Sequence, residues 1–211
     1  MMLAVIDYGA ANLGSVCRAF KRLGVDPLVT ADPSDLQRAT HIVLPGVGSF
    51  ADCSRNLREG GWVDAIQTQV RVHDKAILGV CVGMQLLADE GTEWGKHSGL
   101  GLIPGRVRRL DELGCTLRIP HVGWNDLTVR GGQHSLLSEI PSGTDMYFVH
   151  SYAMETADAG DVWATADYGV PLACVVGNGR VMGVQFHPEK SAKAGLTVLQ
   201  NFLDIPVAAA C

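Results

Sequence analysis

The residue with the clearest chemical potential is Cys81, at the centre of the stretch GVCVG (79–83). A continuous apolar run of strand type leads up to it, and apolar residues at helical spacing follow it. A strand that turns sharply into a helix exposes the side chain at the turn, and this spacing is that of the G-x-S-x-G nucleophile elbow, with sulfur in place of oxygen. The helix amino terminus favours thiolate over thiol. We therefore predict a cysteine nucleophile, and a core cysteine at a strand–helix junction is the alternative.

A thiolate nucleophile needs a base, and among the seven histidines His187 has the neighbours that this role requires. Pro188 follows it and biases it toward an extended conformation. Because alternate side chains of an extended segment point the same way, Glu189 is expected beside the imidazole, where its carboxylate orients the ring. The pattern predicts a triad of Cys81, His187 and Glu189. The alternative is a histidine at a strand end with a glutamate on the surface.

A site for acyl transfer also needs hydrogen-bond donors for an oxyanion. The amide of Val82 directly follows the nucleophile. A second donor is expected from the loop PGVGSF (45–50), which ends another apolar strand, and the amide of Val47 or of Gly48 is suitable there. A flexible glycine loop without a chemical role is the alternative.

Strands and helices alternate along the first half of the sequence. This alternation predicts the scaffold that would position the cysteine, the histidine and the glycine loop. Continuous apolar strands separated by helices indicate an open, mostly parallel α/β sheet flanked by helices. Asn12 is expected to cap the helix that follows it. The expected strands cover residues 2–9, 26–30, 41–50 and 76–81, and the range 41–50 includes the loop that ends its strand. The expected helices cover 13–24, 62–74 and 83–91, and a helical turn is expected at 34–39.

The second half of the sequence is more strand-like. Short candidate strands lie at residues 105–119, 121–129, 145–153 and 161–169. Asn178 and Gly179 stand between two apolar runs and predict a hairpin. A final helix is expected at 191–205, with Ser191 as its N-cap. Since no repeat or linker interrupts the pattern, we expect a single domain over residues 1–211.

Composition excludes several classes of function. Of the 211 residues, 47% are hydrophobic, which is enough for a substantial core. The net charge is −5 and no basic residues cluster on a face, so a nucleic-acid-binding surface is not expected. No apolar run approaches the roughly 18 residues of a membrane span, and the amino terminus lacks the basic region of a signal peptide. The six cysteines include no CxxC pair, so reduced thiols in the cytoplasm are expected.

Three motifs, PGVGSF, GVCVGMQLL and GVQFHPEKS, resemble in their order and spacing those of the class I, triad-type glutamine amidotransferases. Three further stretches narrow the resemblance to the glutaminase subunits of imidazole glycerol phosphate synthase: IDYGAANLGSV at the start, PHVGWN (120–125) and MYFVHSY (146–152). The resemblance spans residues 2 to about 203. It implies a flavodoxin-like class I glutamine amidotransferase fold.

The resemblance implies hydrolysis of L-glutamine through a thioester. Cys81 attacks the side-chain amide carbon, His187 protonates the leaving ammonia and then activates water, and Glu189 orients His187. Val82 and Val47 are the residues whose amides form the oxyanion hole. The residues implied to hold the glutamine are Gly48, Gln85, Glu93, Ser151 and Tyr152.

Glu93 is the implied partner of the substrate's α-ammonium group, because a desolvated cation needs a paired charge. A solvated carboxylate on a loop is the alternative for this residue.

The resemblance further implies a heterodimer with a cyclase subunit that has a (β/α)8-barrel fold. The ammonia passes to that subunit, which makes imidazole glycerol phosphate and an aminoimidazole carboxamide ribotide in histidine biosynthesis. No cofactor and no metal are implied. Asn12, Trp124, Tyr147 and Lys190 are expected at the docking face, although Trp124 could instead be a core residue. His121 and His150 are expected to be structural or at the interface.

One position departs from the family's opening motif, which usually reads Asp-Tyr-Gly-x-Gly-Asn. Here Ala11 replaces the second glycine. A positive φ at this position would strain an alanine. The substitution therefore puts in question the role of this loop in communication with the partner.

Three other functions are compatible with parts of the pattern. A glutaminase of another pathway, such as vitamin B6 or aminodeoxychorismate synthesis, would share the triad but not PHVGWN together with DYGAAN. A non-catalytic binding subunit would keep the fold, but Cys81, His187 and Glu189 are all present. A cysteine peptidase would give no reason for Glu93 or for the aromatic residues of the docking face.

Overall fold

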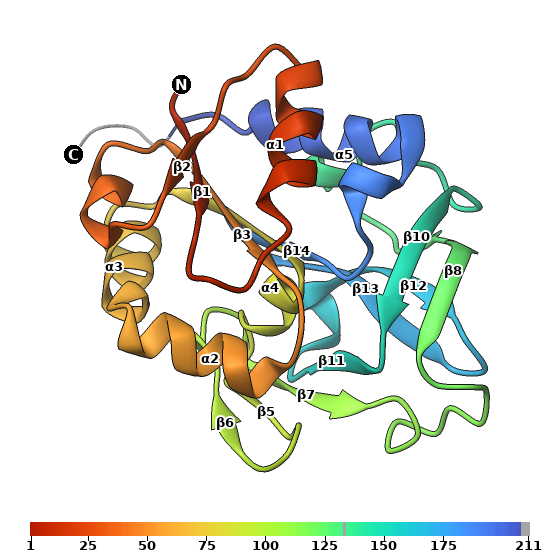
Figure 1. The fold of residues 1–211 in the computed structure, drawn as a ribbon. Coiled ribbons are helices and arrows are strands. Elements are labelled where there is room, and N and C mark those ends of the chain that lie inside the picture. Colours follow the sequence, from red (N-terminus) through yellow and green to blue (C-terminus); the bar gives the residue numbers. More distant parts are fainter. Residues whose placement is uncertain (133, 208–211) are drawn as a thin grey trace.

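The computed structural model describes residues 1–132 and 134–207, so Cys211 lies outside the described part (Figure 1). Its main element is an eight-stranded sheet with the strand order β2-β1-β3-β4-β14-β13-β12-β9. Neighbouring strands from β2 to β14 are parallel, and those from β14 to β9 are antiparallel. The predicted mixed, mostly parallel α/β sheet is therefore confirmed.

The first half of the chain alternates between strands and helices, as the apolar pattern predicts. Its elements are β1 (Leu3–Ile6), α1 (Leu13–Arg22), β2 (Leu28–Thr30), the 3₁₀ turn η1 (Pro33–Gln37), β3 (His41–Gly46), α2 (Phe50–Glu59), α3 (Trp62–Gln67), the π-helical turn η2 (Thr68–Val72), β4 (Ala76–Cys81) and α4 (Val82–Gln85).

The second half contains short strands and 3₁₀ turns, with one long helix at its end. Its elements are β5 (Glu90–Gly91), β6 (His97–Ser98), β7 (Gly105–Arg109), β8 (His121–Asp126), β9 (Thr128–Val129), η3 (Ser135–Leu137), β10 (Asp145–His150), β11 (Tyr152–Thr156), η4 (Ala159–Asp161), β12 (Val162–Asp167), β13 (Pro171–Asn178), β14 (Val181–Val184), η5 (Pro188–Lys190) and α5 (Ala192–Leu203). The predicted hairpin is the β13–β14 pair, in which Asn178 faces Val181.

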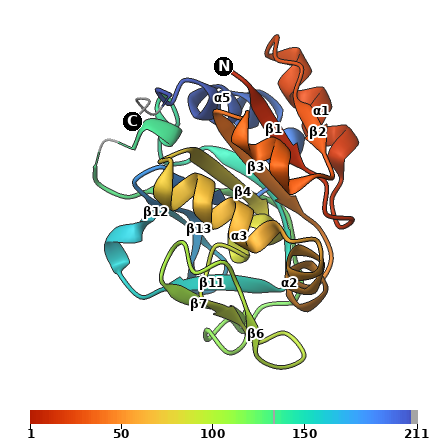
Figure 2. The same ribbon diagram turned by 90° about the vertical axis from the view of Figure 1, so that its left-hand side faces the viewer.

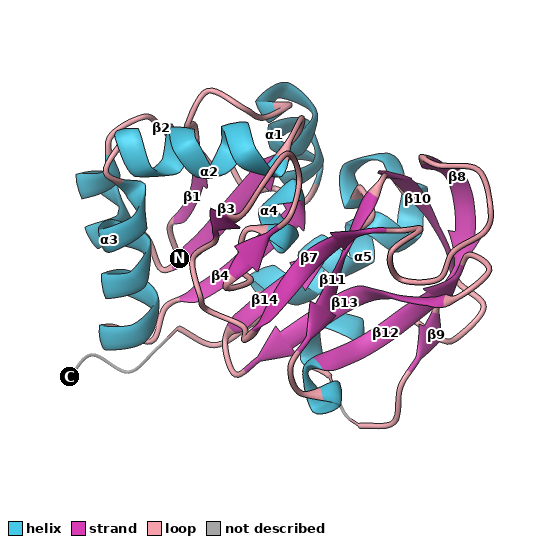
Figure 3. Ribbon diagram, turned by 90° about the horizontal axis from the view of Figure 1, so that it is seen from below, coloured by secondary structure: helices cyan, strands magenta, loops and turns pink. Residues whose placement is uncertain are grey.

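Helices cover both faces of the parallel part of the main sheet. Helices α1 and α5 lie together on one side of β1, β3 and β4, and α2 and α3 lie on the other (Figures 1 and 2). Strands β1, β3, β4 and β14 are buried along their whole length, as continuous apolar strands require. Two smaller sheets, β10-β8 and β11-β7-β5-β6, lie beside the antiparallel part (Figure 3).

Four expectations about the helices differ from the structure. Helix α2 was not expected, although Ser49 accepts a hydrogen bond from the Asp52 amide and is a regular N-cap. Asn12 and Ser191 precede α1 and α5, but neither side chain makes a capping hydrogen bond. The helix expected over 83–91 ends at Gln85, because the amides of residues 100–103 take the carbonyl groups of residues 86–88.

The described cysteines form no disulfide, which agrees with the expectation of free thiols. Cys17 is half-buried, and Cys53, Cys81, Cys115 and Cys174 are buried. Ala11 is not among the residues with positive φ, so the alanine at this position carries no left-handed strain.

The two glycines that flank Cys81 lie where backbones approach closely. A Cβ on Gly79 would meet the carbonyl group of Gly83, and a Cβ on Gly83 would collide with the carbonyl oxygen of Leu44 on β3. The strand–helix turn therefore packs directly on the neighbouring strand, with no room for a methyl group at either position.

Gly83→Ala is expected to reduce the free energy of unfolding by about 1–3 kcal/mol, because overpacking a closed contact forces the backbone to shift. Urea unfolding measures this change. Gly131→Ala is the matched control, since its Cβ would meet no atom within 4 Å, and a change within about 0.5 kcal/mol is expected there. Equal losses in the two variants would contradict the role assigned to the turn.

Candidate active site

Cys81 ends β4 and occupies a strained turn. Its backbone has φ 56° and ψ −114°, a region that L-residues rarely adopt. Gly46 of β3 pairs with it on one side, and β14 runs parallel to β4 on the other. Strained backbones of this kind concentrate at functional sites. The predicted elbow geometry is therefore present, with the sulfur at the carboxyl edge of three parallel strands.

His187 follows β14 and is held in place by main-chain and side-chain contacts. Its Nδ1 donates to Glu189 Oε1 at 2.8 Å, and its backbone amide donates to the Tyr147 carbonyl at 2.9 Å. The Ser191 hydroxyl donates to the His187 carbonyl at 2.7 Å and accepts from the Tyr147 amide at 3.0 Å. The hydroxyl that was expected to cap α5 instead ties the loop of the histidine to β10.

The electrostatics of His187 favour its charged form. Burial lowers the pKa of His187, but hydrogen bonds and the negative charges of the Cys81 thiolate and of Glu189 overcome this effect and raise the pKa to about 9. With Nδ1 directed to the carboxylate, Nε2 is the nitrogen available for proton transfer. His187 can therefore carry a proton at neutral pH beside the sulfur.

A cavity of about 370 Å³ collects two of the predicted catalytic residues and all the predicted substrate-binding residues. It opens beside Cys81 and His187 and extends to the loop after β5 and to the start of β11. The predicted residues that line it are Val47, Gly48, Cys81, Val82, Gln85, Glu93, Ser151, Tyr152, His187 and Lys190. Glu189 lies outside this lining, behind His187.

Glu93 is oriented by the start of α2. Its Oε2 accepts a hydrogen bond from the Phe50 amide at 2.6 Å. Burial raises the pKa of the Glu93 carboxyl, and the hydrogen bond from Phe50 lowers it. One carboxylate oxygen is thereby fixed to the protein, while the side chain contributes to the lining of the cavity.

The Val47 amide is already engaged in this structure. It donates to the carbonyl oxygen of Ala10 at 3.0 Å, and the thiol of Cys53 donates to the Val47 carbonyl at 3.5 Å. In this backbone arrangement the Val47 amide is therefore not free to face an oxyanion, and its role as a donor stays a prediction. Val47 can serve as a donor only after its peptide group leaves Ala10.

Sequence reasoning missed Gln185. This residue is fully buried, accepts a hydrogen bond from Gln85 Nε2 at 3.0 Å and places its own Nε2 at 3.8 Å from Cys81 Sγ. The motif GVQFHPEKS places Gln185 two residues before His187, directly after β14.

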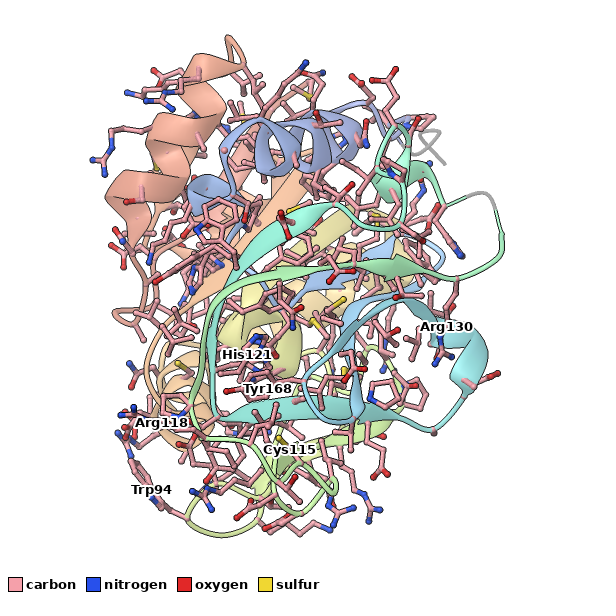
Figure 4. The ribbon with its side chains drawn as sticks, turned by 90° about the vertical axis from the view of Figure 1, so that its right-hand side faces the viewer. Trp94, Cys115, Arg118, His121, Arg130 and Tyr168 are labelled. Carbon is pink, nitrogen blue, oxygen red and sulfur yellow. The ribbon has the colours of Figure 1, made fainter. Side chains whose placement is uncertain are left out.

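His121 and His150 are buried and paired. His121 Nδ1 lies 2.9 Å from His150 Nε2, and the His121 ring stacks on Tyr168 with centroids 4.0 Å apart (Figure 4). Burial lowers the pKa of His150 to about 4 and also lowers that of His121. His150 is therefore neutral at physiological pH, and it lines the cavity.

The expected docking residues lie next to the site. Trp124 is 55% exposed and contacts Tyr147 across the β8–β10 pair at a centroid distance of 5.9 Å. Lys190 Nζ lies 6.0 Å from the centre of the Tyr147 ring. Asn12 is exposed at the start of α1. The alternative that Trp124 is a core residue is thus wrong.

The described residues hold no group of three or more side chains with the ligand types of a metal site. Among the helices of residues 1–132 and 134–207, none has the length and apolar character of a membrane span.

The chain is similar to a known family over most of its length. The profile of the family described as Glutamine amidotransferase class-I matches residues 4–205. The imidazole glycerol phosphate synthase subunit HisH of Rhodospirillum rubrum is 45% identical over 210 residues, covering 96% of this chain and 98% of that protein. The subunit of the same name from Bacillus velezensis is 46% identical over 204 residues, covering 95% of each.

Solved structures share the fold at lower identity. A structure titled as PurLQS from Thermotoga maritima matches with a TM-score of 0.77 and 20% identity, covering 96% of this chain and 97% of that one. A structure titled as a glutamine amidotransferase matches with a TM-score of 0.76 and 22% identity, covering 97% and 98%. These likenesses support the predicted fold class.

The raised pKa of His187 predicts a pH-dependent stability. Because the folded-state pKa of about 9 exceeds the ordinary 6.5, protonated His187 stabilises the fold below about pH 6.5, and this contribution is lost as the pH rises through about 9. Glu189→Gln removes one cause of the shift. The difference in urea midpoint between the wild type and Glu189→Gln should therefore be largest below pH 6.5 and shrink above pH 9.

Glu90→Gln is the control, because Glu90 pairs at 2.6 Å with a lysine instead of a histidine. Its difference from the wild type should stay flat over the same range, because the Lys96–Glu90 pair contains no histidine. A flat difference for Glu189→Gln as well would contradict the assigned coupling.

Proposed function

Because the chain belongs to the class-I glutamine amidotransferase family, we propose that the cavity beside Cys81 is its glutaminase site. The observation that carries the proposal is the meeting of a strained cysteine, a histidine backed by Glu189 and the fixed carboxylate of Glu93 at one cavity. At full length the relatives are subunits of imidazole glycerol phosphate synthase. The chain is a glutaminase subunit of this kind, in histidine biosynthesis.

The first half of the reaction forms a thioester. The Cys81 thiolate attacks the side-chain amide carbon of L-glutamine and gives a tetrahedral oxyanion. As the carbon–nitrogen bond breaks, protonated His187 gives its Nε2 proton to the departing nitrogen, and ammonia leaves. Glu189 holds the ring with Nε2 toward the sulfur, since Nδ1 donates to its carboxylate.

The second half hydrolyses the thioester. Neutral His187 takes a proton from water, the hydroxyl attacks the thioester carbon, and the carbon–sulfur bond breaks. Glutamate leaves, and Cys81 and His187 return to the thiolate–imidazolium pair. The raised pKa of His187 suits both roles, because the charged form donates in the first half and is regenerated in the second.

Two amides are proposed to stabilise the oxyanion. The Val82 amide directly follows the nucleophile at the start of α4. The Val47 amide becomes the second donor once it leaves Ala10. Removal of one oxyanion donor slows related reactions by about 10²–10³-fold, so activity before this change is expected to be low.

The amino-acid end of glutamine is proposed to lie between Glu93 and the start of β11. One oxygen of the Glu93 carboxylate accepts from the Phe50 amide, and the negative charge of this group pairs with the α-ammonium group. Gly48, Gln85, Ser151 and Tyr152 surround the remaining polar atoms. This arrangement gives Glu93 a role that a peptidase would not need.

The proposed partner is a cyclase subunit with a (β/α)8-barrel fold, which receives the ammonia in a heterodimer. Trp124, Tyr147 and Lys190 form one cluster beside the cavity, and Asn12 starts the neighbouring α1. An exposed tryptophan with a cation nearby has the composition of an interface hot spot. We also propose that the chain acts as a single domain in the cytoplasm.

The first test is glutamate release from L-glutamine by the purified chain, alone and with the cyclase loaded with its ribulosyl ligand. Low activity alone and strong stimulation by the loaded partner are expected, because the second oxyanion donor is engaged elsewhere in the free chain. Full activity alone, without a response to the partner, would assign the triad to the glutaminase of another pathway.

Cys81→Ser is expected to reduce glutamine hydrolysis by more than about 10³-fold, since the reaction loses its nucleophile. The complex should still use added ammonia for cyclisation, which is measured as product formation from the ribulosyl substrate. Loss of the ammonia-dependent reaction in this variant would refute the proposed division of labour between the subunits.

Trp124→Ala is expected to weaken the heterodimer by about 2 kcal/mol or more, as truncation of a hot-spot aromatic does. Titration calorimetry with the cyclase measures the change. Val72→Ala is the matched control, because Val72 is 71% exposed but lies just before β4 begins, at the opposite edge of the sheet. Similar affinities for the two variants would place the interface elsewhere.

A further inference from the structure

Gln185 is buried completely and connects the nucleophile with the lining of the cavity. Its backbone amide donates to the Cys174 carbonyl on β13 at 2.9 Å, which fixes the position of the residue. Its Oε1 accepts from Gln85 Nε2 at 3.0 Å, and its Nε2 lies 3.8 Å from Cys81 Sγ. A neutral amide therefore bridges a catalytic sulfur and a side chain of the substrate cavity.

One backbone carbonyl determines the direction of these hydrogen bonds. The Tyr152 oxygen can only accept, so Gln85 must present Nε2 to it, at 3.0 Å. The second hydrogen on that nitrogen is directed to Gln185 Oε1, and Gln185 is left with its N–H groups toward the sulfur. The same carbonyl also accepts from His150 Nδ1 at 2.9 Å, which fixes the tautomer of that neutral ring.

The sulfur needs such a donor once it ionises. As a thiol, Cys81 donates to the Val149 carbonyl at 3.8 Å. A thiolate has no hydrogen to donate, so the same carbonyl then presents a negative dipole end to a negative sulfur. An N–H group from Gln185 offsets this repulsion, in addition to the charge of His187.

We propose that Gln185 is a positioning residue of the glutaminase reaction, donating a hydrogen bond to the Cys81 thiolate and turning the Gln85 oxygen toward the substrate. Both N–H groups of Gln85 have partners, and its Oε1 remains available to accept an N–H group of glutamine. This inference rests on the proposed function, because the acceptor at Gln85 matters only if glutamine occupies the cavity.

The test separates thiolate stabilisation from a role in folding. Alkylation of Cys81 by iodoacetamide is followed against pH in the full chain, with the modified peptide quantified by mass spectrometry because other thiols are free. Gln185→Met removes both hydrogen bonds at similar side-chain length. The midpoint of the alkylation profile should rise by about 0.5–1 pH unit, and the KM for glutamine in the complex with the cyclase should rise about tenfold.

Gln85→Met is the second variant, and it does not touch the sulfur. The amide of Gln185 then loses the partner that sets its direction, so the alkylation midpoint should rise here as well. The double variant should shift no further than Gln185→Met alone, because both changes break one chain of hydrogen bonds. Additive shifts, or profiles that overlay the wild type, would overturn the proposal, and Gln85→Met decides the matter if Gln185→Met does not fold.

Other titratable groups face the sulfur and must stay constant. These are His187 with Glu189, His150 on the cavity wall, and Tyr8 and Cys53 near the elbow. Both variants leave all of them in place. Gln69→Leu is the matched control, since it removes a buried glutamine outside this chain of hydrogen bonds, and its alkylation profile should equal that of the wild type.

The outcomes also distinguish this proposal from the proposed function. A wild-type complex that does not hydrolyse glutamine would refute the glutaminase assignment, while the alkylation profiles would still report whether Gln185 acts on the thiolate. Normal hydrolysis with unchanged alkylation profiles and unchanged KM in both variants would leave the glutaminase in place and refute the role of Gln185.

Discussion

The contact on which the site depends is the direct packing of the Gly83 backbone on the Leu44 carbonyl of β3. It allows β4 to turn into α4 within one residue, and the turn holds Cys81 at φ 56°. The sulfur then lies at the carboxyl edge of the sheet with β3 on one side and β14 on the other. Because the loops that follow these two strands carry Val47 and His187, the groups that must meet the sulfur arrive from its nearest neighbours in the sheet.

Rigid main-chain groups orient most of the chemistry in this site. The Tyr152 carbonyl sets the direction of the Gln85 amide and the tautomer of His150. The Tyr147 carbonyl and the Ser191 hydroxyl hold the His187 loop from its two sides. A carbonyl that can only accept leaves its partners no choice of proton position. Neutral amides and imidazoles inside the site are thereby fixed without additional buried charges, which are expensive to desolvate.

The features that sequence could predict are those carried by local patterns. The elbow around Cys81 and the strands β1 to β4 follow from glycine spacing and apolar runs, and the structure contains all of them. Helix α2 is also predictable from sequence, because Ser49 is a regular N-cap. Long-range contacts determine the features that differ from the prediction. The carbonyl groups of residues 86–88 accept hydrogen bonds from the amides of residues 100–103, so α4 ends early. The Ser191 hydroxyl donates to the His187 carbonyl and does not cap α5. No local sequence pattern predicts these distant hydrogen-bond partners.

The engagement of Val47 with Ala10 has a consequence for control of the reaction. A net backbone hydrogen bond is worth about 1 kcal/mol, whereas an oxyanion donor contributes about 3–4 kcal/mol to the transition state. A small difference in binding energy is therefore enough to switch a large catalytic effect. Ala10 lies in the loop that leads to Asn12 and α1, on the proposed docking side. Under the proposed function, release of Val47 from Ala10 leaves Cys81, His187 and Glu189 in place. A cyclase that binds this loop is then expected to raise the rate and to couple ammonia production to its consumer.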